Sequence, residues 1–419
     1  MNFCRAVLKV GGVMYRLSSS IRTRSAEDSL ILASEIAEEM GVTRVTDITW
    51  LDKIGVPVFA GIRPFAAKGS LNVHNGKGMR PNEAKIGAFM ESIEFSLAES
   101  MKHQRDIRKF SIEEIQKSLP SGLFISSFGA QLGVSLKEDE EIFCVEATDI
   151  ISGHNGLIPA ELIFHPVNLS GQRSIFGGTT TNGLCSGNTR LEAVIHGVCE
   201  VLERDVKSFD IIQNRSSIVD INTEPEAIRA LREKIEQAGL ILSLRKTVNE
   251  FKLPYFSAFI LEPDTQNPIS VADGYGLHPL AEIAATRAIT EAVQSRLTHI
   301  HGGRDDIVKR IHFYQKNPDL DEKVIMDNLR KKILDCSRMV PFFDGYEEKL
   351  EIESVEALWQ NIKVKMASAG LEHCFVYDLN PPDFPFNVLR VVIPKAEFIE
   401  SEMKRVGPRF IDAFKRREK

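Results

Sequence analysis

One stretch, residues 181–205, reads Thr181-Asn182-Gly183-Leu184-Cys185-Ser186-Gly187-Asn188-Thr189-Arg190-Leu191-Glu192-Ala193-Val194-Ile195-His196-Gly197-Val198-Cys199-Glu200-Val201-Leu202-Glu203-Arg204-Asp205. A turn rich in Gly, Asn and Thr runs into a segment with helical periodicity, in which each residue advances about 100° around the axis. With Glu192 at zero, Glu200 and Glu203 lie at roughly 80° and 20°, and the aliphatic side chains lie between roughly 180° and 300°. No Lys or Arg stands on the acidic face before Arg204. Because like charges at this spacing repel, the pattern predicts a face that needs a cation, and hard divalent cations favour carboxylates.

A second helix, predicted to begin at Pro81, repeats this pattern. When residues 83–94 are written over residues 192–203, all three glutamates of the two segments coincide, and Gly78 falls on Gly187. A weaker third copy covers residues 284–297, where Glu291 and Gln294 repeat the spacing of three. An internal repeat is one interpretation, and chance similarity between amphipathic helices is the other. The acidic faces stand on their spacing in either case.

These acids are predicted to line one acidic cleft. Two Mg²⁺ ions that bridge a nucleoside triphosphate would neutralise it, because Mg²⁺ takes one or two carboxylates together with phosphate and water. The alternative is that the glutamates lie on separate, solvated helix faces. The predicted metal ligands are Glu91, Glu94, Glu192, Glu200, Glu203 and Glu291, and the candidate phosphate contacts are Arg22, Lys77, Arg204 and Arg287.

The common nucleotide-binding and hydrolase motifs are missing from the sequence. Asn75-Gly76-Lys77-Gly78 has no Ser or Thr after the lysine and no glycine at the P-loop offset, so it is not a Walker A motif. There is no HExxH, GxSxG, GxGxxG or paired CxxC, so zinc hydrolysis and the α/β-hydrolase triad have no support. Cys185, predicted in the loop before the helix, is a candidate nucleophile or sulfur carrier, and the alternative is a small structural residue.

Length and composition are those of an ordinary globular protein. The chain has 419 residues, 43% of them hydrophobic and 26% charged, and a formal net charge of −6, which indicates no nucleic-acid-binding surface. A basic tail runs from Lys404 to Lys419, and its plain interpretation is a solvated helix end. Six scattered cysteines and no stretch of membrane-spanning or signal-peptide type favour a cytoplasmic protein without a membrane partner.

Helical and strand patterns alternate without a strict βαβ rhythm and without a low-complexity linker, which predicts a single large α+β domain with no evident cut point. Residues 1–20 are expected to be a loose extension, with a first helix after an N-cap at Ser25. Residues 75–78 are expected to be a loop. Further predicted helices are 113–119, 225–239, 309–339 with a break at Pro318, and 355–369, and predicted strands are 44–49, 56–62, 71–74, 123–128, 142–148, 157–162, 241–246, 255–260, 269–274, 374–378 and 388–393.

From about Arg22 to about Glu397 the sequence resembles the YcaO family of ATP-dependent cyclodehydratases and thioamide-forming enzymes. The motifs that carry the resemblance occur in the family's order: Glu27-Asp28-Ser29, Asn75-Gly76-Lys77-Gly78 followed by Glu91-x-x-Glu94, residues 181–205, Thr290-Glu291-Ala292-Val293-Gln294-Ser295-Arg296 with Gly303-Arg304-Asp305-Asp306, and Val391-Val392-Ile393-Pro394. One departure is Pro394-Lys395-Ala396-Glu397, where relatives usually show Pro-Gly-hydrophobic-Glu.

The resemblance implies an ATP site without a Walker motif. It implies that the six glutamates above handle Mg²⁺ and phosphate, and that Arg22, Ser29, Lys77, Asn188, Arg204 and Arg287 contact the nucleotide. Glu200, Glu203 and Arg204 are the expected catalytic residues, with Cys185 as a further candidate, whereas Glu83 has no counterpart among the family's ligands. Family chemistry activates an amide oxygen by phosphoryl transfer from ATP, after which a nucleophile adds to the carbon and phosphate leaves. The implied domains are an extension (1–20), a YcaO-type catalytic domain (21–405) and a basic tail (406–419).

The nucleophile separates the branches of the family. A Cys, Ser or Thr side chain gives an azoline, sulfide gives a thioamide, and an amine gives an amidine. Azoline-forming members commonly end in a Pro-rich tail, whereas the last proline here is Pro408. Residues 22–30, 41–52 and 61–99 look most like YcaO proteins that work with a TfuA partner, whose theme is thioamidation. The resemblance thus favours sulfur insertion into a ribosomal peptide (RiPP) or a small lactam such as a purine base, as in relatives linked to thioguanine, with a TfuA-like or sulfur-donor partner and a homodimer expected. The alternatives are an azoline- or amidine-forming enzyme and a non-catalytic nucleotide-binding scaffold.

Overall fold

The computed structural model confirms the α+β class and describes residues 6–9, 12–171, 173–263, 270–304, 308–346, 350–400 and 403–417. The chain forms two compact units, each assembled from separate segments of the sequence. The first, unit 1, comprises Met1–Ala66, Leu71–Ile93 and Arg215–Ser354, and the second, unit 2, comprises Ala67–Ser70, Glu94–Asn214 and Val355–Lys419. Because the chain passes repeatedly from one unit to the other, composition along the sequence gives no cut point. The boundaries at residues 20 and 405 stay predictions.

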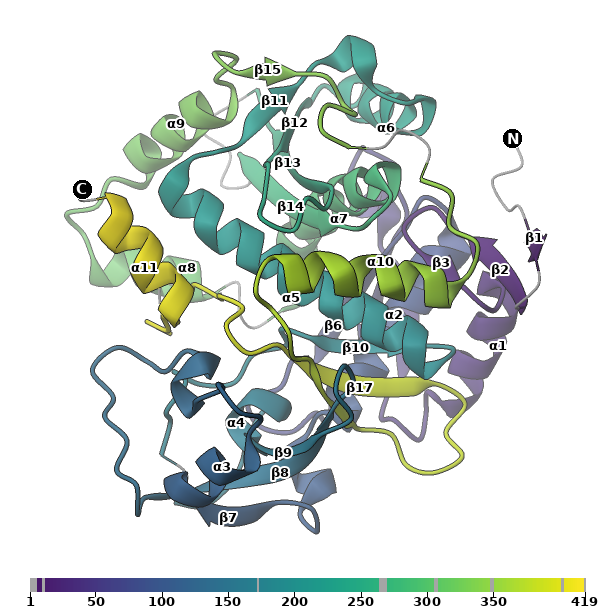
Figure 1. The fold of residues 1–419 in the computed structure, drawn as a ribbon. Helices are drawn as coiled ribbons and strands as arrows, with labels where there is room; N and C mark the ends of the chain where they lie inside the picture. The colour runs from purple at the N-terminus through teal and green to yellow at the C-terminus, as the bar shows by residue number, and fades with distance from the viewer. Residues whose placement is uncertain are drawn as a thin grey trace. The chain divides into compact units, whose positions relative to one another are not determined.

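Unit 1 contains a five-stranded sheet in the order β14-β13-β12-β11-β15 and two three-stranded sheets, β4-β5-β6 and β1-β2-β3. Helix α7 lies against β13 and β14 (Figure 1). The elements are β1 (Ala6–Lys9), β2 (Gly12–Arg16), β3 (Ile21–Arg22), α1 (Ala26–Ile36), β4 (Arg44–Asp47), η1 (Thr49–Leu51), β5 (Val58–Ile62), β6 (Val73–Lys77), most of α2 (Pro81–Leu97), β11 (Ser217–Val219), η4 (Ile221–Thr223), α6 (Glu226–Gln237), β12 (Ile241–Lys246), β13 (Tyr255–Leu261), β14 (Val271–Leu277), α7 (Ala281–His301), α8 (Val308–Lys316), α9 (Glu322–Ile333) and β15 (Met339–Val340).

The core of unit 1 is built where these helices meet the sheets. Strands β5, β12 and β13 and helices α6 and α7 contribute buried aliphatic side chains to one cluster. Glycines let two helices approach the strands that precede them. A Cβ placed on Gly276 of β14 would lie 2.0 Å from the carbonyl oxygen of Ala284 in α7, and one on Gly76 of β6 would lie 2.1 Å from the carbonyl oxygen of Ala84 in α2. The acidic helices are thereby held directly against the strand backbones.

Unit 2 is built on a six-stranded sheet in the order β10-β17-β16-β8-β7, with β9 paired to β8. Helix α5 packs on β10 and β17, and α10 lies alongside α5 (Figure 1). Gly197 makes this packing possible, because a Cβ there would lie 2.5 Å from the sulfur of Cys185. The elements are η2 (Ser100–His103), β7 (Arg108–Ser111), α3 (Ile112–Ser118), η3 (Ile125–Phe128), β8 (Glu141–Asp149), β9 (Asn155–Pro159), α4 (Ala160–Ile163), β10 (Leu184–Gly187), α5 (Arg190–Gln213), α10 (Val355–Ser368), β16 (Phe375–Asp378), β17 (Asn387–Val392) and α11 (Pro408–Arg417).

Most predicted elements form, and the structure corrects several other expectations. Ser25 caps α1 as predicted and accepts the Asp28 N–H at 3.1 Å. Residues 123–128 are not a strand, because the side chain of Gln116 takes up the carbonyl of Leu123 and the N–H of Ile125, and η3 forms instead. The strand predicted at 157–162 ends at residue 159, where α4 begins. Residues 75–77 belong to β6 because they pair with β5, and residues 6–9 and 12–16 form the paired strands β1 and β2.

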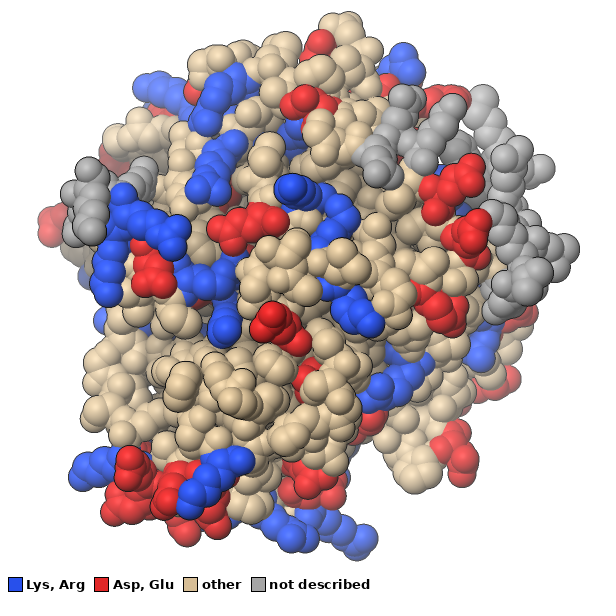
Figure 2. Space-filling view, viewed as in Figure 1, with Lys and Arg blue, Asp and Glu red and all other residues tan. Residues whose placement is uncertain are grey.

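The surface carries both signs of charge. Figure 2 shows Lys and Arg side chains interspersed with Asp and Glu over the visible face. Of the basic tail predicted as a solvated helix end, Arg409 and Lys415-Arg416-Arg417 lie in α11, which begins at Pro408. Arg405 precedes this helix and instead donates to the backbone carbonyls of Phe128 and Gly129. None of the helices in the described part of the chain has the length and apolar character that crossing a membrane requires.

Candidate functional site

Two of the predicted metal ligands lie in unit 1, next to a predicted phosphate contact. The ammonium of Lys77 on β6 donates to Glu291 on α7 at 2.6 Å, so residues 214 positions apart meet. The carboxylate of Glu91 on α2 accepts the backbone N–H of Asn75 at 3.1 Å. Burial raises the pKa of Glu91, the charges of Arg304 and Lys77 and the Asn75 hydrogen bond lower it, and the net direction is upward. A cation bound here would favour the ionised form of this buried carboxyl group.

Arginines form a second group in unit 1, around the buried His278. Burial first, and then the charges of Arg287, Arg16 and Arg22, lower the pKa of His278 to about 3. The structure therefore brings together Arg22 and Arg287, both predicted phosphate contacts. The Nε of Arg287 is buried and has no hydrogen-bond partner among the described residues. A bidentate anion such as a phosphate would fit these guanidinium groups.

Sequence reasoning missed Arg16. Its strand β2 pairs with β3, so that Tyr15 lies opposite Arg22, and its guanidinium donates to Glu282 at 2.8 Å. No motif marks this residue, and only the strand pairing brings it to the cluster. Ser29, the remaining predicted nucleotide contact of unit 1, is buried in the first turns of α1. Glu83 accepts the hydroxyl of Ser18, a contact that suits a structural residue.

In unit 2 the strand–helix junction at β10 and α5 orients two predicted ligands. The hydroxyl of Ser186 on β10 donates to Glu94 at 2.5 Å. The backbone N–H of Asn188 donates to Glu192 at 2.9 Å and its side-chain amide does so at 3.2 Å, while Thr189 caps the helix. The predicted nucleotide contact Asn188 thus fixes the orientation of a predicted metal ligand. Sequence reasoning gave Ser186 no role in the site, because its partner Glu94 lies 92 positions away.

The expected catalytic residues lie further along α5. Glu203 is 2% exposed, and the Nε of Arg204 lies 4.0 Å from its carboxylate. Glu200 is half-buried, and its charge acts on both Arg390 and Cys185 in the interior of unit 2. A guanidinium directly beside a buried carboxylate suits the handling of a charged phosphoryl group.

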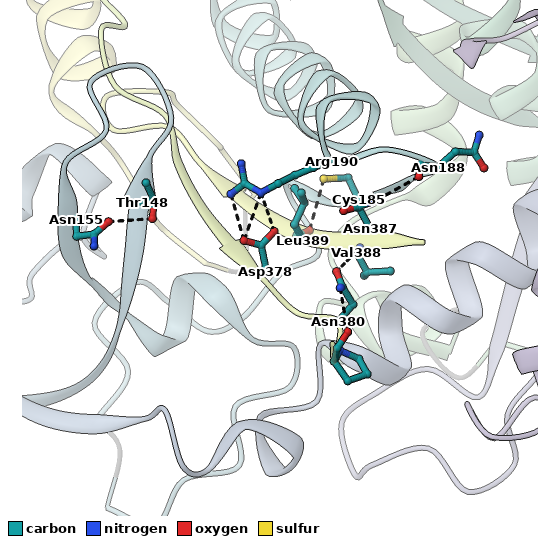
Figure 3. Close-up of polar contacts among 11 residues, drawn as sticks. Thr148, Asn155, Cys185, Asn188, Arg190, Asp378, Asn380, Asn387, Val388 and Leu389 are labelled. Atoms are coloured by element: carbon teal, nitrogen blue, oxygen red, sulfur yellow. Dashed lines mark hydrogen bonds and ion pairs between the residues drawn. The ribbon is translucent and has the colours of Figure 1, made fainter. Parts of the chain in front are cut away.

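Cys185 lies on strand β10, and its predicted place in a loop was wrong. Its thiol is fully buried and donates to the carbonyl of Leu389 at 3.5 Å (Figure 3). Burial raises its pKa well above the usual value, and the charges of Glu94 and Glu200 raise it further. Because the thiolate is the reactive form, this environment disfavours a nucleophile or sulfur carrier at Cys185.

The departure at Lys395 has a backbone explanation. Lys395 adopts φ +68, in the left-handed region that favours glycine, and its N–H donates to the carbonyl of Ser127 at 2.6 Å. The turn therefore keeps the conformation for which the usual glycine of the family is suited, at some cost in strain.

The predicted site residues divide between the two units. The described residues contain no preformed group of three or more His, Cys, Asp or Glu side chains able to hold a metal ion, so the ligand set stays a prediction. The chemistry of the donors nevertheless fits Mg²⁺ and a polyphosphate, since the predicted residues of each unit include both carboxylate oxygens and guanidinium groups. Glu91, Glu291, Arg22, Ser29, Lys77 and Arg287 belong to unit 1, and Glu94, Glu192, Glu200, Glu203, Asn188 and Arg204 belong to unit 2.

Known proteins resemble the chain over most of its length. A protein of Methanothermobacter thermautotrophicus, itself uncharacterised, is 32% identical over 373 residues, which cover 88% of this chain and 93% of the relative. A Rhizobium leguminosarum bv. trifolii protein encoded in the tfuA 3′ region is 29% identical and covers 90% of this chain and 89% of its own. The structure of YcaO from Methanopyrus kandleri, bound with AMPPCP and Mg²⁺, has a TM-score of 0.73 at 22% identity and covers 93% of this chain and 96% of that one.

A family model described as YcaO cyclodehydratase, ATP- and Mg²⁺-binding, matches residues 75–397. That description confirms the two predicted cofactors, ATP and Mg²⁺, and the prediction of an ATP-dependent enzyme. The match spans most of the chain and includes the acidic helices α2, α5 and α7, so the chain belongs to the YcaO family.

Proposed function

We propose that this protein uses Mg·ATP to phosphorylate the oxygen of an amide-type carbonyl and then replaces that oxygen with sulfur. In this reaction the γ-phosphoryl group moves to the carbonyl oxygen, a sulfide-level donor adds to the carbon, and the C–O bond breaks as phosphate leaves. The products are a thioamide, ADP and phosphate. The observation that carries the proposal is the relative encoded in the tfuA 3′ region, which aligns with 90% of the chain.

The side chains of the two units have separate proposed roles. In unit 1, Arg22, Ser29, Lys77 and Arg287 hold the nucleotide phosphates, and Glu91 and Glu291 hold Mg²⁺. In unit 2, Asn188 orients Glu192, while Glu94, Glu200 and Glu203 hold metal and Arg204 faces the transferring group. Bound Mg²⁺ supplies neutralising positive charge, and the protein supplies position, as phosphoryl transfer requires. The support lies in the contacts of Lys77 with Glu291, of Asn75 with Glu91 and of Asn188 with Glu192.

The substrate is proposed to be a peptide backbone amide or a small lactam such as a purine base. Both present the same C(=O)–N group for activation. A TfuA-like protein or another sulfur donor is the proposed partner, a homodimer is the proposed assembly, and the cytoplasm is the proposed location. The last of these accords with the free state of the five described cysteines.

A second candidate is azoline formation, which the family description as a cyclodehydratase favours. In that reaction a Cys, Ser or Thr side chain of the substrate replaces sulfide, and water is lost overall. Amidine formation would use an amine in the same position. A non-catalytic nucleotide-binding scaffold would bind Mg·ATP without turnover.

One experiment separates these functions. The purified protein is incubated with Mg·ATP, sulfide and candidate peptides or purines, and phosphate release and product mass are measured. Exchange of one oxygen for one sulfur supports the proposal, whereas loss of one water indicates an azoline. Nucleotide binding without any turnover indicates a scaffold, and the absence of both refutes the enzyme proposal.

A variant pair ties the activity to the site. Glu200→Gln is expected to abolish phosphate release and to leave the circular dichroism spectrum unchanged, because it removes one charge at constant size. The matched control is Glu113→Gln, since this exposed glutamate forms an ion pair with Lys117, one helical turn away in α3. Unfolding of Glu200→Gln would instead support a structural role for the glutamate.

A further inference from the structure

Arg390, on strand β17, is a charged residue that has no role in the reaction proposed above. Its side chain is fully buried, although a buried charge is costly unless it is well compensated. Its guanidinium donates to three backbone carbonyls, those of Ile163 at 2.7 Å, Asn182 at 2.8 Å and Thr180 at 2.8 Å. None of its hydrogen bonds within the described chain goes to a carboxylate. The N–H groups of Arg390 therefore hold backbone carbonyls in place.

A buried acid holds the preceding part of the same loop. Glu161 on α4 is 4% exposed, and its carboxylate accepts the backbone N–H groups of Ile175 at 2.8 Å, Phe176 at 3.2 Å and Gly178 at 2.8 Å. It also accepts the hydroxyl of Ser174 at 2.6 Å. One buried anion thus binds N–H groups, and one buried cation binds carbonyls, along residues 174–182. We call this stretch the clamped loop.

The clamped loop leads directly into strand β10. The N–H of Leu184 donates to Thr181 at 2.8 Å, and Leu184 lies opposite Arg390 in the pairing of β10 with β17. Two residues later, Ser186 donates to Glu94. The negative charges of Glu200 and Glu94 also raise the pKa of Arg390, against the larger lowering by burial. The pairing of β10 with β17 and the Ser186 hydrogen bond therefore connect Arg390 to Glu94, one of the acids assigned to Mg²⁺.

We propose that Arg390 is a positioning residue, which together with Glu161 fixes the clamped loop and through β10 holds Glu94 in its orientation for Mg·ATP. This inference rests on the function proposed above. Arg390 itself does not touch the reacting atoms.

The test compares Arg390→Met, Arg390→Lys and the control Arg190→Met. Arg190 lies near the same junction but forms an exposed ion pair with Asp378 at 3.0 Å, which Figure 3 shows, and such pairs contribute little. Lysine is a fair conservative replacement, because Lys246 of this protein already donates to three backbone carbonyls from one ammonium. The readouts are hydrogen–deuterium exchange of residues 174–184 and calorimetric binding of AMPPCP with Mg²⁺.

In Arg390→Met we expect exchange of the clamped loop to rise, and Mg·AMPPCP affinity to fall, by at least about tenfold, which is about 1.4 kcal/mol in binding. Arg390→Lys should restore most of both, and Arg190→Met should change neither. Slow exchange and unchanged affinity in Arg390→Met, or no rescue by lysine, would overturn the inference. If Arg390→Met does not fold, the exchange of the clamped loop is measured in Glu161→Gln instead. The glutamine amide keeps one acceptor oxygen, so it can accept only one of the two sets of hydrogen bonds that the two oxygens of Glu161 accept. If the unsubstituted protein binds no Mg·AMPPCP, the proposed function fails, while the exchange data still test the clamp.

Discussion

Substitution of Gly76 by alanine tests how the acidic helix of unit 1 is held. An ideal Cβ at this position would lie 2.1 Å from both the carbonyl oxygen of Ala84 and the backbone nitrogen of Ala88, whereas ordinary contact begins at 3.4 Å. Both neighbours are main-chain atoms of α2, so no side chain can rotate away. Helix and strand must therefore separate by about 1.3 Å, which is 3.4 minus 2.1.

The separation acts on the site as well as on the core. If α2 moves by that amount, the 3.1 Å hydrogen bond from the Asn75 N–H to Glu91 lengthens to about 4.4 Å and breaks. Overpacking of this kind costs typically 1–3 kcal/mol, and two contacts with rigid backbone place Gly76→Ala at about 3 kcal/mol or more. Loss of the Glu91 orientation should also weaken Mg·ATP binding by at least about tenfold.

Urea unfolding and calorimetry with Mg·AMPPCP measure the two effects. Gly122→Ala is the control, since Gly122 has no atom within 4 Å of an added Cβ and only its φ of +85 opposes the change. That strain costs roughly 1–2 kcal/mol and leaves nucleotide binding intact. If Gly76→Ala were as stable as the unsubstituted protein and bound nucleotide equally well, close strand–helix packing would not be what positions Glu91.

Three further predictions concern unit 2. Lys395→Gly should raise the free energy of unfolding by about 1 kcal/mol in urea titrations, because it relieves the left-handed strain at φ +68. Cys185→Ala should retain phosphate release at a modest cost in stability, because the raised pKa of the buried thiol keeps it in its unreactive form. Loss of turnover in a folded variant would instead show that the thiol takes part in the chemistry. Asp149 is buried, which raises its pKa, but hydrogen bonds from the Cys374 N–H, Ser152 and His373 prevail and lower it below 3.8. The contribution of Asp149 to the free energy of unfolding is therefore present above pH 3.8 and is lost as the pH falls below that value. In Asp149→Asn, the free energy of unfolding should depend less on pH in this acidic range.

Local signals predicted the helices of the site well. Ser25 and Thr189 are polar N-caps, and each accepts an N–H of the first helical turn, as such residues do before an apolar repeat. The spacing of glutamates along α5 and α2 follows directly from helical geometry. The sequence therefore sufficed to place the acids on particular helix faces.

Contacts between residues that are far apart in the sequence could not be predicted from it. Arg390 looked like an ordinary strand residue, because the carbonyl of Asn182 that compensates its charge lies 208 positions earlier. Lys77 was assigned to a loop, since the pairing of β6 with β5 leaves no local mark. Cys185 was placed before a helix, whereas its strand exists only through pairing with β17. In each case the deciding partner is tertiary, and a pattern confined to neighbouring residues could not reveal it.

The same packing device recurs at the three acidic helices. Gly76 on β6, Gly187 on β10 and Gly276 on β14 each lie too close to the backbone of the following helix to accept a Cβ. A close strand brings polar groups within reach of the helix, as when the Asn75 N–H binds Glu91 and Lys77 binds Glu291. The similarity of the three segments can therefore be explained without common ancestry. Any strand that must come close to a helix to orient a carboxylate on it benefits from a glycine at the contact. Common origin of the segments stays a prediction, whereas the requirement for glycine follows from the contacts themselves.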